Sequence, residues 1–356
     1  MPLDMRILIA TDAWTPQVNG VVRTYQRVEE ALLAEGHEVF FATPDRYRTV
    51  PCPTYPEIRL SLVTAWQLDK LLDEFSPDAV HIATEGPIGW AARRACLKQK
   101  RPFTTAYHTR FPEYVAERVP VPVAWIYKMM RVFHNASNGT MVATKSLGVE
   151  LEARGFTSLL PWTRGVDTEM FHPRQGRVFG AGPVALYVGR VAPEKNIEAF
   201  LDLDIDLQKV VVGDGPSLEE LEQSYPDVTF TGALEGEALA AAYSAADVFV
   251  FPSKTDTFGI VMLEAMASGL PVAAFPVTGP IDVIEDGVTG ALDDDLKTAI
   301  LRALELDRQV CLEKAAGFSW AQCGALFLEN LKPVADVAVV KSVALPKRSA
   351  FPKSGK

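Results

Sequence analysis

Two carboxylates eight positions apart, Asp256 and Glu264, lie in a segment whose pattern predicts a strand, a polar loop and a helix. The helix is predicted to begin near Gly259, which places Asp256 just before it and Glu264 about two turns inside it. Ionised carboxylates only accept hydrogen bonds, and one carboxylate can accept from two hydroxyl groups. We therefore expect Asp256 to bind sugar hydroxyls and Glu264 to bind ribose hydroxyls. The alternatives are a helix N-cap for Asp256 and a solvated surface charge for Glu264.

The start of this helix offers a binding site for an anion. The backbone N–H groups of a first helical turn have no acceptor inside the helix, and here they belong to Phe258, Gly259 and Ile260. Because the helix dipole also favours negative charge at this end, we expect a diphosphate there. Together with the two carboxylates, this predicts that the site binds a nucleotide diphosphate sugar, which would be the sugar donor.

Two cations, Arg190 and Lys195, stand in the loop after a predicted strand over 184–188. Loops that follow parallel strands meet at one edge of the sheet, so both cations are expected to flank the diphosphate. The charge on the leaving phosphate grows as the glycosidic bond breaks, and the cations would therefore stabilise the transition state more than the bound donor. A pair of solvated loop charges is the alternative.

Gly213 and Gly215 follow another predicted strand, over 209–212. Glycines at such a place let the backbone approach a ligand closely, so both are candidates for the donor site. A tight turn between a strand and a helix explains them equally well.

The elements that position these residues form two series of strands with helices between them. Short apolar runs are typical of buried parallel strands, and helical patterns separate them. The predicted strands cover residues 6–11, 38–43, 78–83 and 103–107 in the first series and 184–188, 209–212, 228–230, 247–251 and 270–275 in the second. The fold class is therefore α/β, with two doubly wound Rossmann-like domains that face each other across a cleft.

A Gly- and Pro-rich stretch between residues 173 and 183 is the predicted domain boundary. We expect an acceptor-binding domain over 1–173 and a nucleotide-sugar-binding domain over 183–318. A final helix is predicted over about 320–335, and the basic, Pro-containing tail 341–356 is expected to be disordered.

Composition narrows the function further. The formal net charge of −10 argues against a protein that binds nucleic acid, which needs clustered Lys and Arg. The four cysteines form no CxxC pair, so neither a zinc site nor a disulfide framework is predicted. Asp204, Asp206 and the run Asp293–Asp295 are expected to be solvated loop charges rather than metal ligands.

No apolar run reaches 18 residues and no signal peptide is present, so we expect a cytoplasmic protein with at most peripheral membrane contact.

The residues described above occur in the order typical of glycosyltransferase family 4, which this chain resembles over nearly its whole length. The resemblance implies the GT-B fold. The family's carboxylate motif usually begins with Glu, whereas this chain has Asp256. The segment Asp12–Arg23 resembles the family's N-terminal glycine loop, which implies that Gly20 lets the backbone approach the diphosphate. The segment Phe318–Trp320 resembles the start of the final helix, which in this architecture returns to the first domain.

The resemblance also implies a retaining hexosyltransferase. His108 follows a first-domain strand, where the family often places a histidine near the donor sugar, and it joins Arg190, Lys195 and Asp256 as a catalytic candidate. For a single histidine, a structural role is the alternative. No second carboxylate is placed as a nucleophile, so we expect a front-face route in which the leaving phosphate accepts the acceptor proton. The cations and the helix start hold the charge, and no metal or other cofactor is required.

A predicted helix in the first half carries apolar residues at helical spacing with basic residues between them. Its candidate residues for contact with the acceptor or a membrane are Trp125, Lys128, Met129, Arg131 and Phe133. A basic amphipathic helix can lie in a membrane interface and give access to a lipid acceptor. An ordinary helix that faces the core is the alternative.

The segment Asp12–Arg23 also resembles that of bacterial glycolipid synthases and lipid mannosyltransferases. This implies a lipid acceptor, with diacylglycerol as the leading candidate, and a place at the inner face of the membrane. UDP-glucose or UDP-glucuronate is the expected donor, and GDP-mannose with a lipid or polysaccharide acceptor is the alternative. A nucleotide-sugar 2-epimerase and a non-catalytic nucleotide-sugar-binding protein are the remaining alternatives.

Overall fold

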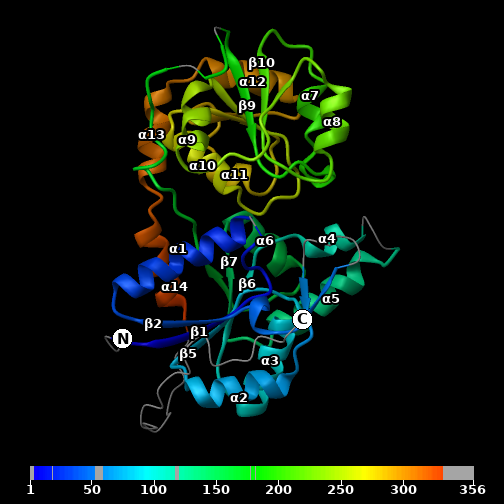
Figure 1. Ribbon diagram of the computed structural model, residues 1–356, viewed down its shortest axis with the longest axis vertical. Helices are drawn as coiled ribbons and strands as arrows, with labels where there is room; N and C mark the ends of the chain where they lie inside the picture. Colours follow the sequence, from blue (N-terminus) through cyan, green and yellow to red (C-terminus); the bar gives the residue numbers. More distant parts are fainter. Residues whose placement is uncertain are drawn as a thin grey trace. The chain divides into compact units, whose positions relative to one another are not determined.

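The computed structural model describes residues 4–17, 19–52, 59–116, 120–176, 178–180 and 182–331. The chain separates into two compact units, each built around one sheet (Figure 1). The first unit contains Met1–Ala143, Gly148–Trp162 and the chain from Cys323 on, and the second contains Thr144–Leu147 and Thr163–Gln322. Residues 332–335 of the predicted final helix and the predicted tail 341–356 lie outside the described residues.

The first unit has a parallel sheet with the strand order β2-β1-β5-β6-β7-β8, and a separate two-stranded hairpin, β3-β4. Its strands are β1 (Arg6–Ala10), β2 (Glu38–Ala42), β3 (Thr49–Pro51), β4 (Arg59–Ser61), β5 (Ala79–Ile82), β6 (Thr104–Tyr107), β7 (Gly139–Val142) and β8 (Leu159–Pro161). Its helices are α1 (Gly20–Ala34), the 3₁₀ turn η1 (Pro44–Arg46), α2 (Ala65–Phe75), α3 (Pro87–Gln99), α4 (Phe111–Ala116), α5 (Val123–His134), most of α6 (Lys145–Ala153) and most of α14 (Trp320–Asn330).

The second unit also has a parallel sheet, in the order β11-β10-β9-β12-β13-β14. Its strands are β9 (Val184–Val188), β10 (Gln208–Val212), β11 (Thr229–Phe230), β12 (Val248–Phe251), β13 (Val272–Ala274) and β14 (Gly290–Leu292). Its helices are η2 (Pro193–Lys195), α7 (Glu198–Leu201), α8 (Leu218–Ser224), α9 (Gly236–Ala245), α10 (Ile260–Ala267), α11 (Pro280–Val283), α12 (Leu296–Leu304) and α13 (Arg308–Ala316). The strand order reverses between β9 and β12, which is where a doubly wound sheet binds its ligand.

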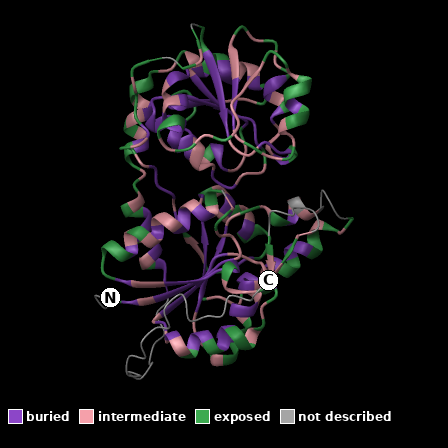
Figure 2. Ribbon diagram, viewed as in Figure 1, coloured by how far each residue is buried: buried purple, intermediate pink, exposed green. Residues whose placement is uncertain are grey.

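The central strands of both parallel sheets are buried on both faces, as expected for sheets that are covered by helices (Figure 2). In the first unit, Leu8 of β1 and its neighbours Val80 and Ile82 of β5 pack with α2 and α3 in one apolar cluster. Because successive side chains point to opposite faces, His81 lies on the other face, where its ring contacts Phe327 of α14. The second sheet buries every residue of β9 and β12.

The boundary between the two units lies earlier in the chain than the predicted boundary at 173–183. It falls at Trp162 and Thr163, and the residues up to 182 belong to the second unit. The physical reason is that this segment packs on α9. The ring of Phe171 contacts Tyr243 with centroids 5.5 Å apart, and the backbone N–H of Arg174 donates to Ser244 Oγ at 2.5 Å.

Within the described part of the chain, no helix combines the length and the apolar character needed to cross a membrane.

Candidate active site

The donor-site candidates of the second unit lie on three loops at the carboxyl edge of its sheet. These loops follow β10, β9 and β12, which are adjacent strands. Two hydrogen bonds tie the β9 loop to the β12 loop: Asn196 Nδ2 donates to the carbonyl of Pro252 at 3.0 Å, and Thr255 Oγ1 donates to the carbonyl of Glu194 at 3.2 Å. The structure therefore brings Lys195 and Asp256, 61 positions apart, to one place.

Lys195 and Asp256 form an ion pair, with Nζ 2.6 Å from Oδ1 and about four-fifths of each side chain buried. Burial alone would raise the pKa of Asp256, but the charge and hydrogen bond of Lys195, with a smaller contribution from Ser253, outweigh it and hold the pKa below its ordinary value. Asp256 is therefore ionised at neutral pH.

The second carboxylate oxygen of Asp256, Oδ2, is buried and accepts no well-formed hydrogen bond within the described part of the chain. A buried polar atom without a partner is costly, so such atoms are rare and commonly mark a functional site. A hydroxyl group of a bound sugar is a donor that would satisfy this oxygen.

Asp256 is not a helix N-cap, which was the alternative from the sequence. Helix α10 begins at Ile260, and its N-cap is Gly259 with a φ of 81°. A Cβ atom at Gly259 would lie 2.9 Å from Phe251 Cζ and 2.9 Å from Met262 Cε, so both the conformation and the space require glycine. Phe258 is buried, and α10 begins four residues after Asp256.

Glu264 lies inside α10 and is 96% buried, since only 4% of its surface is exposed. It is therefore not a solvated surface charge. Tyr243 of α9 donates its hydroxyl hydrogen to Glu264 Oε2 at 2.8 Å. This bond holds the carboxylate in one orientation, which is what a residue that binds ribose hydroxyls needs. Tyr243 was not found from the sequence, because nothing in its local pattern indicates a partner 21 residues later.

Gly213 and Gly215 hold two loops together. A Cβ atom at Gly213 would lie 1.8 Å from the carbonyl oxygen of Gly189, and one at Gly215 would lie 2.2 Å from that of Val191. The N–H of Val191 donates to the carbonyl of Asp214 at 2.9 Å. These glycines thus let two segments of backbone approach each other closely. This favours the alternative of a tight turn over the prediction that the glycines let the backbone approach a ligand.

Arg190 lies between these two contacts in the loop after β9 and is partly exposed. The hydroxyl of Tyr187 donates to its carbonyl at 2.8 Å, which fixes the backbone of the loop. The position agrees with a cation beside the diphosphate.

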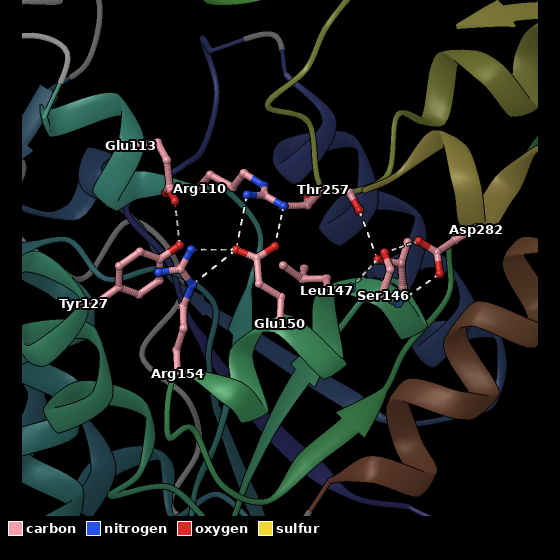
Figure 3. A network of polar contacts seen from close by, with 10 residues as sticks. Arg110, Glu113, Tyr127, Ser146, Leu147, Glu150, Arg154, Thr257 and Asp282 are labelled. Atoms are coloured by element: carbon pink, nitrogen blue, oxygen red, sulfur yellow. Dashed lines mark hydrogen bonds and ion pairs between the residues drawn. The ribbon is translucent and has the colours of Figure 1, made fainter. Parts of the chain in front are cut away.

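The loop that carries Asp256 has a second support, which the sequence did not predict. Thr144 Oγ1 donates to the carbonyl of Thr257 at 3.4 Å. The next turn of the chain is held in the same way, because the N–H of Ser146 donates to Asp282 Oδ1 at 2.9 Å and its hydroxyl donates to Oδ2 (Figure 3). The start of α6 therefore belongs to the second unit and braces its candidate site.

In the first unit, Gly20 is the first residue of α1 and is exposed. The side chain of Asn19 caps this helix by accepting from the N–H groups of Val21 and Val22, each at 3.0 Å. The predicted glycine loop is thus a capped helix start.

Asp12 caps a different helix, α3. Its carboxylate accepts from the N–H groups of Ile88 at 2.9 Å and Gly89 at 3.2 Å, and from Thr84 Oγ1 at 3.0 Å. A Cβ atom at Gly86, the N-cap of α3, would lie 2.4 Å from Asp12 Cγ. The missing side chain at Gly86 leaves room for the carboxylate.

We expect Asp12 to make the stability of the protein depend on pH. Burial raises its pKa to about 6 despite these hydrogen bonds. An acid whose pKa is raised in the folded state holds its proton longer when folded, so its contribution to stability is lost as the pH rises through 6. The free energy of unfolding, measured with urea, should therefore fall by about 2 kcal/mol more in the wild type than in Asp12→Asn between pH 4.5 and 7.5. Parallel curves for the two proteins would contradict this.

His108 follows β6 and is partly exposed, with Nε2 2.9 Å from the hydroxyl of Tyr25. Its ring also contacts Trp162, with centroids 5.8 Å apart. The sequence did not predict these partners, because Tyr25 lies 83 positions from His108 along the chain. His108 is thus held in place at the carboxyl edge of the first sheet.

The predicted acceptor helix, α5, has an exposed apolar side and a buried one. Trp125 is 70% exposed, Met129 41% and Val132 54%, and Lys128 is exposed beside them. An apolar pocket of about 320 Å³ adjoins this side. It is lined by Phe111, Val115, Val121, Trp125, Ile126 and Met129.

Two of the predicted residues on α5 have other roles. Phe133 is fully buried, with its ring 5.0 Å from that of Trp90, so the prediction that it contacts acceptor or membrane is wrong. It lies on the same side of the helix as Ile126 and Met130, which face the core. Arg131 is partly buried and donates to the carbonyl of Arg154 at 2.8 Å.

A polar network, found only from the structure, holds α4, α5 and α6 together (Figure 3). Glu150 pairs with Arg110 at 2.5 Å and with Arg154 at 3.1 Å. Arg154 also lies over the ring of Tyr127, 4.0 Å from its centroid, and Tyr127 donates to Glu113 Oε1 at 2.6 Å. This network fixes the helix that carries the exposed apolar side.

The predicted loop carboxylates have local partners. Asp295 caps α12 by accepting from the N–H groups of Lys297 and Thr298, and Asp293 accepts from the N–H of Asp295 at 3.0 Å. Among the described residues, no three His, Cys, Asp or Glu side chains lie close enough together to hold a metal ion.

Two Rossmann-like parallel sheets, with charged side chains gathered at the carboxyl edge of the second, are typical of glycosyltransferases of the GT-B fold. The comparisons with known proteins agree. Residues 18–170 match the model of Glycosyltransferase Family 4, and residues 182–306 match that of Glycosyl transferases group 1. The chain therefore belongs to glycosyltransferase family 4.

Curated relatives are transferases. A GDP-mannose-dependent alpha-mannosyltransferase from Corynebacterium glutamicum is 32% identical and covers 94% of this chain and 89% of the relative. A sulfoquinovosyl transferase from Arabidopsis thaliana is 32% identical over 82% of this chain and 65% of the relative. An alpha-monoglucosyldiacylglycerol synthase from Streptococcus pneumoniae is 28% identical over 84% and 78%. The chain is thus a glycosyltransferase enzyme, which argues against the epimerase and the non-catalytic binding protein.

Solved structures confirm the fold. A sucrose-phosphate synthase from Thermosynechococcus elongatus has a TM-score of 0.72 at 21% identity, over 91% of this chain and 98% of that chain. An Anabaena protein in complex with UDP-glucose has a TM-score of 0.68 at 15% identity, over the same shares.

Proposed function

We propose that this enzyme transfers a hexose or hexuronic acid from a nucleotide diphosphate sugar to a lipid acceptor, with retention of anomeric configuration. The acceptor we propose is diacylglycerol, and the reaction belongs to membrane glycolipid synthesis. The observation that carries the donor half of the proposal is the Lys195–Asp256 pair, four residues before the start of α10, with a buried Oδ2 that accepts no well-formed hydrogen bond within the described part of the chain.

Each group of this site has one task in the proposed reaction. Asp256 Oδ2 accepts a hydroxyl hydrogen of the donor sugar, and Glu264 accepts from the ribose. Lys195, Arg190 and the first N–H groups of α10 hold the diphosphate and the charge that develops on it. His108 donates to or accepts from the transferred sugar, as the family resemblance implies.

The proposed chemistry is a front-face substitution without a metal. The bond between the anomeric carbon and the phosphate oxygen breaks, the acceptor oxygen attacks from the same face, and the phosphate oxygen takes the acceptor proton. Two cationic side chains and a helix start supply the positive charge that a divalent ion supplies in other phosphate-transfer sites.

The names of the relatives support a lipid acceptor and leave two donor classes to be tested. The name of the alpha-monoglucosyldiacylglycerol synthase is in line with the transfer of glucose to diacylglycerol, and UDP-glucose stays the donor expected from the sequence. The GDP-mannose-dependent relative, which covers 94% of this chain, makes GDP-mannose the second candidate.

The test is an incubation of the purified enzyme with diacylglycerol vesicles and EDTA. UDP-glucose, UDP-glucuronate and GDP-mannose are added separately, and the lipid extract is analysed by mass spectrometry. A new glycolipid with one donor supports the proposal and identifies the sugar. Nucleotide release without a glycolipid, for every donor, would contradict the lipid acceptor.

We further propose that the exposed side of α5 contacts the inner face of the membrane. The side combines Trp125 and Met129 with a cationic residue, Lys128, as interfacial helices do. The variant Trp125→Ser/Met129→Ser should bind anionic vesicles at least about tenfold more weakly, because two apolar side chains no longer enter the interface. Cosedimentation measures this, and Trp66→Ser is the control, since Trp66 of α2 is 69% exposed. Equal losses in both variants would count against a specific role of α5.

A further inference from the structure

The hydroxyl group of Tyr25 lies between two histidine rings in the first unit. Tyr25 Oη is 2.8 Å from His81 Nε2 and 2.9 Å from His108 Nε2. On the far side of its ring, His81 Nδ1 is 2.8 Å from Thr104 Oγ1. Tyr25, His81 and Thr104 are fully buried. These side chains form a hydrogen-bonded chain from the interior of the sheet to His108.

The hydrogen-bonding capacity of these groups couples the two rings. A phenol hydroxyl has one hydrogen to donate, so Tyr25 donates to His81 or to His108 but not to both. In one arrangement Thr104 donates to His81 Nδ1, His81 Nε2 donates to Tyr25, and Tyr25 donates to His108 Nε2. In the other arrangement every hydrogen bond runs the opposite way.

Both arrangements have the same consequence for His108. Its Nε2 is engaged by Tyr25, which holds the ring at this nitrogen. Nδ1 carries the proton in the first arrangement and lacks it in the second. Tyr25 and His81 thus set both the orientation of the ring and the role of its second nitrogen.

Stability alone does not call for polar side chains at these positions. The buried side of α1 is otherwise lined mainly by Val22, Val28 and Leu32, and a phenylalanine at position 25 would fill the same space without a polar group to satisfy. Burial also keeps water from competing for the hydrogen bonds of Tyr25 and His81, which makes them stronger and the geometry more rigid.

Aromatic side chains of the first unit enclose this hydrogen-bonded chain. The ring of Trp162 lies 5.8 Å from that of His108, and Phe327 of α14 lies 4.9 Å from His81. Trp162 Nε1 donates to the carbonyl of Cys323 at 3.1 Å, which fixes the position of the Trp162 ring. Trp162 and Cys323 both belong to the first unit and lie next to boundaries between the units.

We propose that Tyr25 and His81 are positioning residues for His108: they hold its ring through Nε2 and couple the position of its proton to the direction of their own hydrogen bonds. The proposal rests on the function proposed above, in which His108 contacts the transferred sugar. It adds two residues, neither of which contacts substrate, to the machinery of the reaction.

The first test is spectroscopic and does not depend on sugar transfer. The chain contains five histidines, so protein labelled with ¹⁵N only at histidine gives a simple imidazole spectrum, in which His108→Gln identifies the His108 signals. In Tyr25→Phe, we expect these signals to move towards those of a mobile imidazole with both tautomers populated. Unchanged His108 signals in Tyr25→Phe would overturn the proposal.

The second test is kinetic. Tyr25→Phe should lower kcat by about tenfold to a hundredfold, with little change in the KM of donor or acceptor, because the ring is misplaced rather than lost. Thr104→Val, which removes the far end of the chain, should change the spectrum and kcat in the same direction but less. The control is Tyr225→Phe, which removes a hydroxyl that bonds to Asp202 at 2.6 Å in the second unit. A spectral shift in Tyr25→Phe with wild-type kcat would also overturn the proposal, whereas a wild type that forms no glycolipid would contradict the proposed function and leave the spectral test valid.

Discussion

Replacement of Lys195 by alanine should lower kcat by about a hundredfold to a thousandfold, which is the range for removal of one group that stabilises developing negative charge. Lys195 is mostly buried, and one of its three N–H donors is bound to Asp256 Oδ1. We propose that the positive charge of Lys195 stabilises the leaving phosphate, whose negative charge is greatest in the transition state. The KM of the acceptor should change little. Steady-state kinetics with both substrates varied measures this.

The same replacement also leaves the carboxylate of Asp256 without its cationic partner, which can destabilise the fold. The experiment must therefore separate a loss of stability from a loss of catalysis. Lys195→Ala/Asp256→Ala removes both charges and is the control. We expect this double variant to recover the thermal stability that Lys195→Ala loses, while its turnover stays low. Wild-type turnover in Lys195→Ala, or full recovery of turnover in the double variant, would remove Lys195 from the mechanism.

Replacement of Glu264 by glutamine should weaken donor binding by about tenfold to a hundredfold, because hydrogen bonds to an ionised acceptor contribute roughly 1.5 to 3 kcal/mol. The amide oxygen of glutamine can still accept from Tyr243, which preserves the packing between α9 and α10. Calorimetry with the nucleoside diphosphate measures the change.

A matched ligand makes this test specific for the ribose. Wild type and Glu264→Gln should bind a 2′,3′-dideoxynucleoside diphosphate with similar affinity, since the hydroxyls that Glu264 is proposed to bind are missing. Tyr243→Phe should weaken binding of the normal nucleotide less than Glu264→Gln does. If Glu264→Gln loses the same factor with both ligands, Glu264 acts on the fold of the site and not on the ribose.

Patterns along the chain predicted the elements, but not the contacts between them. Runs such as Arg6–Ala10 and Val184–Val188 are apolar and rich in branched side chains, and both form strands of the parallel sheets. Strand β7 was missed because it begins with Gly139, which is unfavourable in a strand by itself. Here a Cβ atom would lie 2.3 Å from Leu160 Cδ1 of the neighbouring strand, so the leucine side chain occupies the space that glycine leaves.

For the candidate site, too, the sequence did not predict the contacts between its residues. The order and spacing of Lys195, Asp256 and Glu264 indicated a donor site, yet the ion pair and the burial of Glu264 depend on residues distant in sequence. A single histidine in a strand, such as His81, resembles any buried polar residue until its partner Tyr25 is known. Phe133 shows the opposite error, because helical spacing alone does not tell which side of α5 faces the core.

The most direct test of the central claim is the anomeric configuration of the product formed on diacylglycerol vesicles. The enzyme is incubated with the active α-linked donor in EDTA, and the purified glycolipid is analysed by proton NMR. The account predicts an α-linked sugar on the lipid hydroxyl. A β-linked product would contradict the retaining, front-face mechanism, and the absence of any lipid-linked sugar would contradict the proposed acceptor.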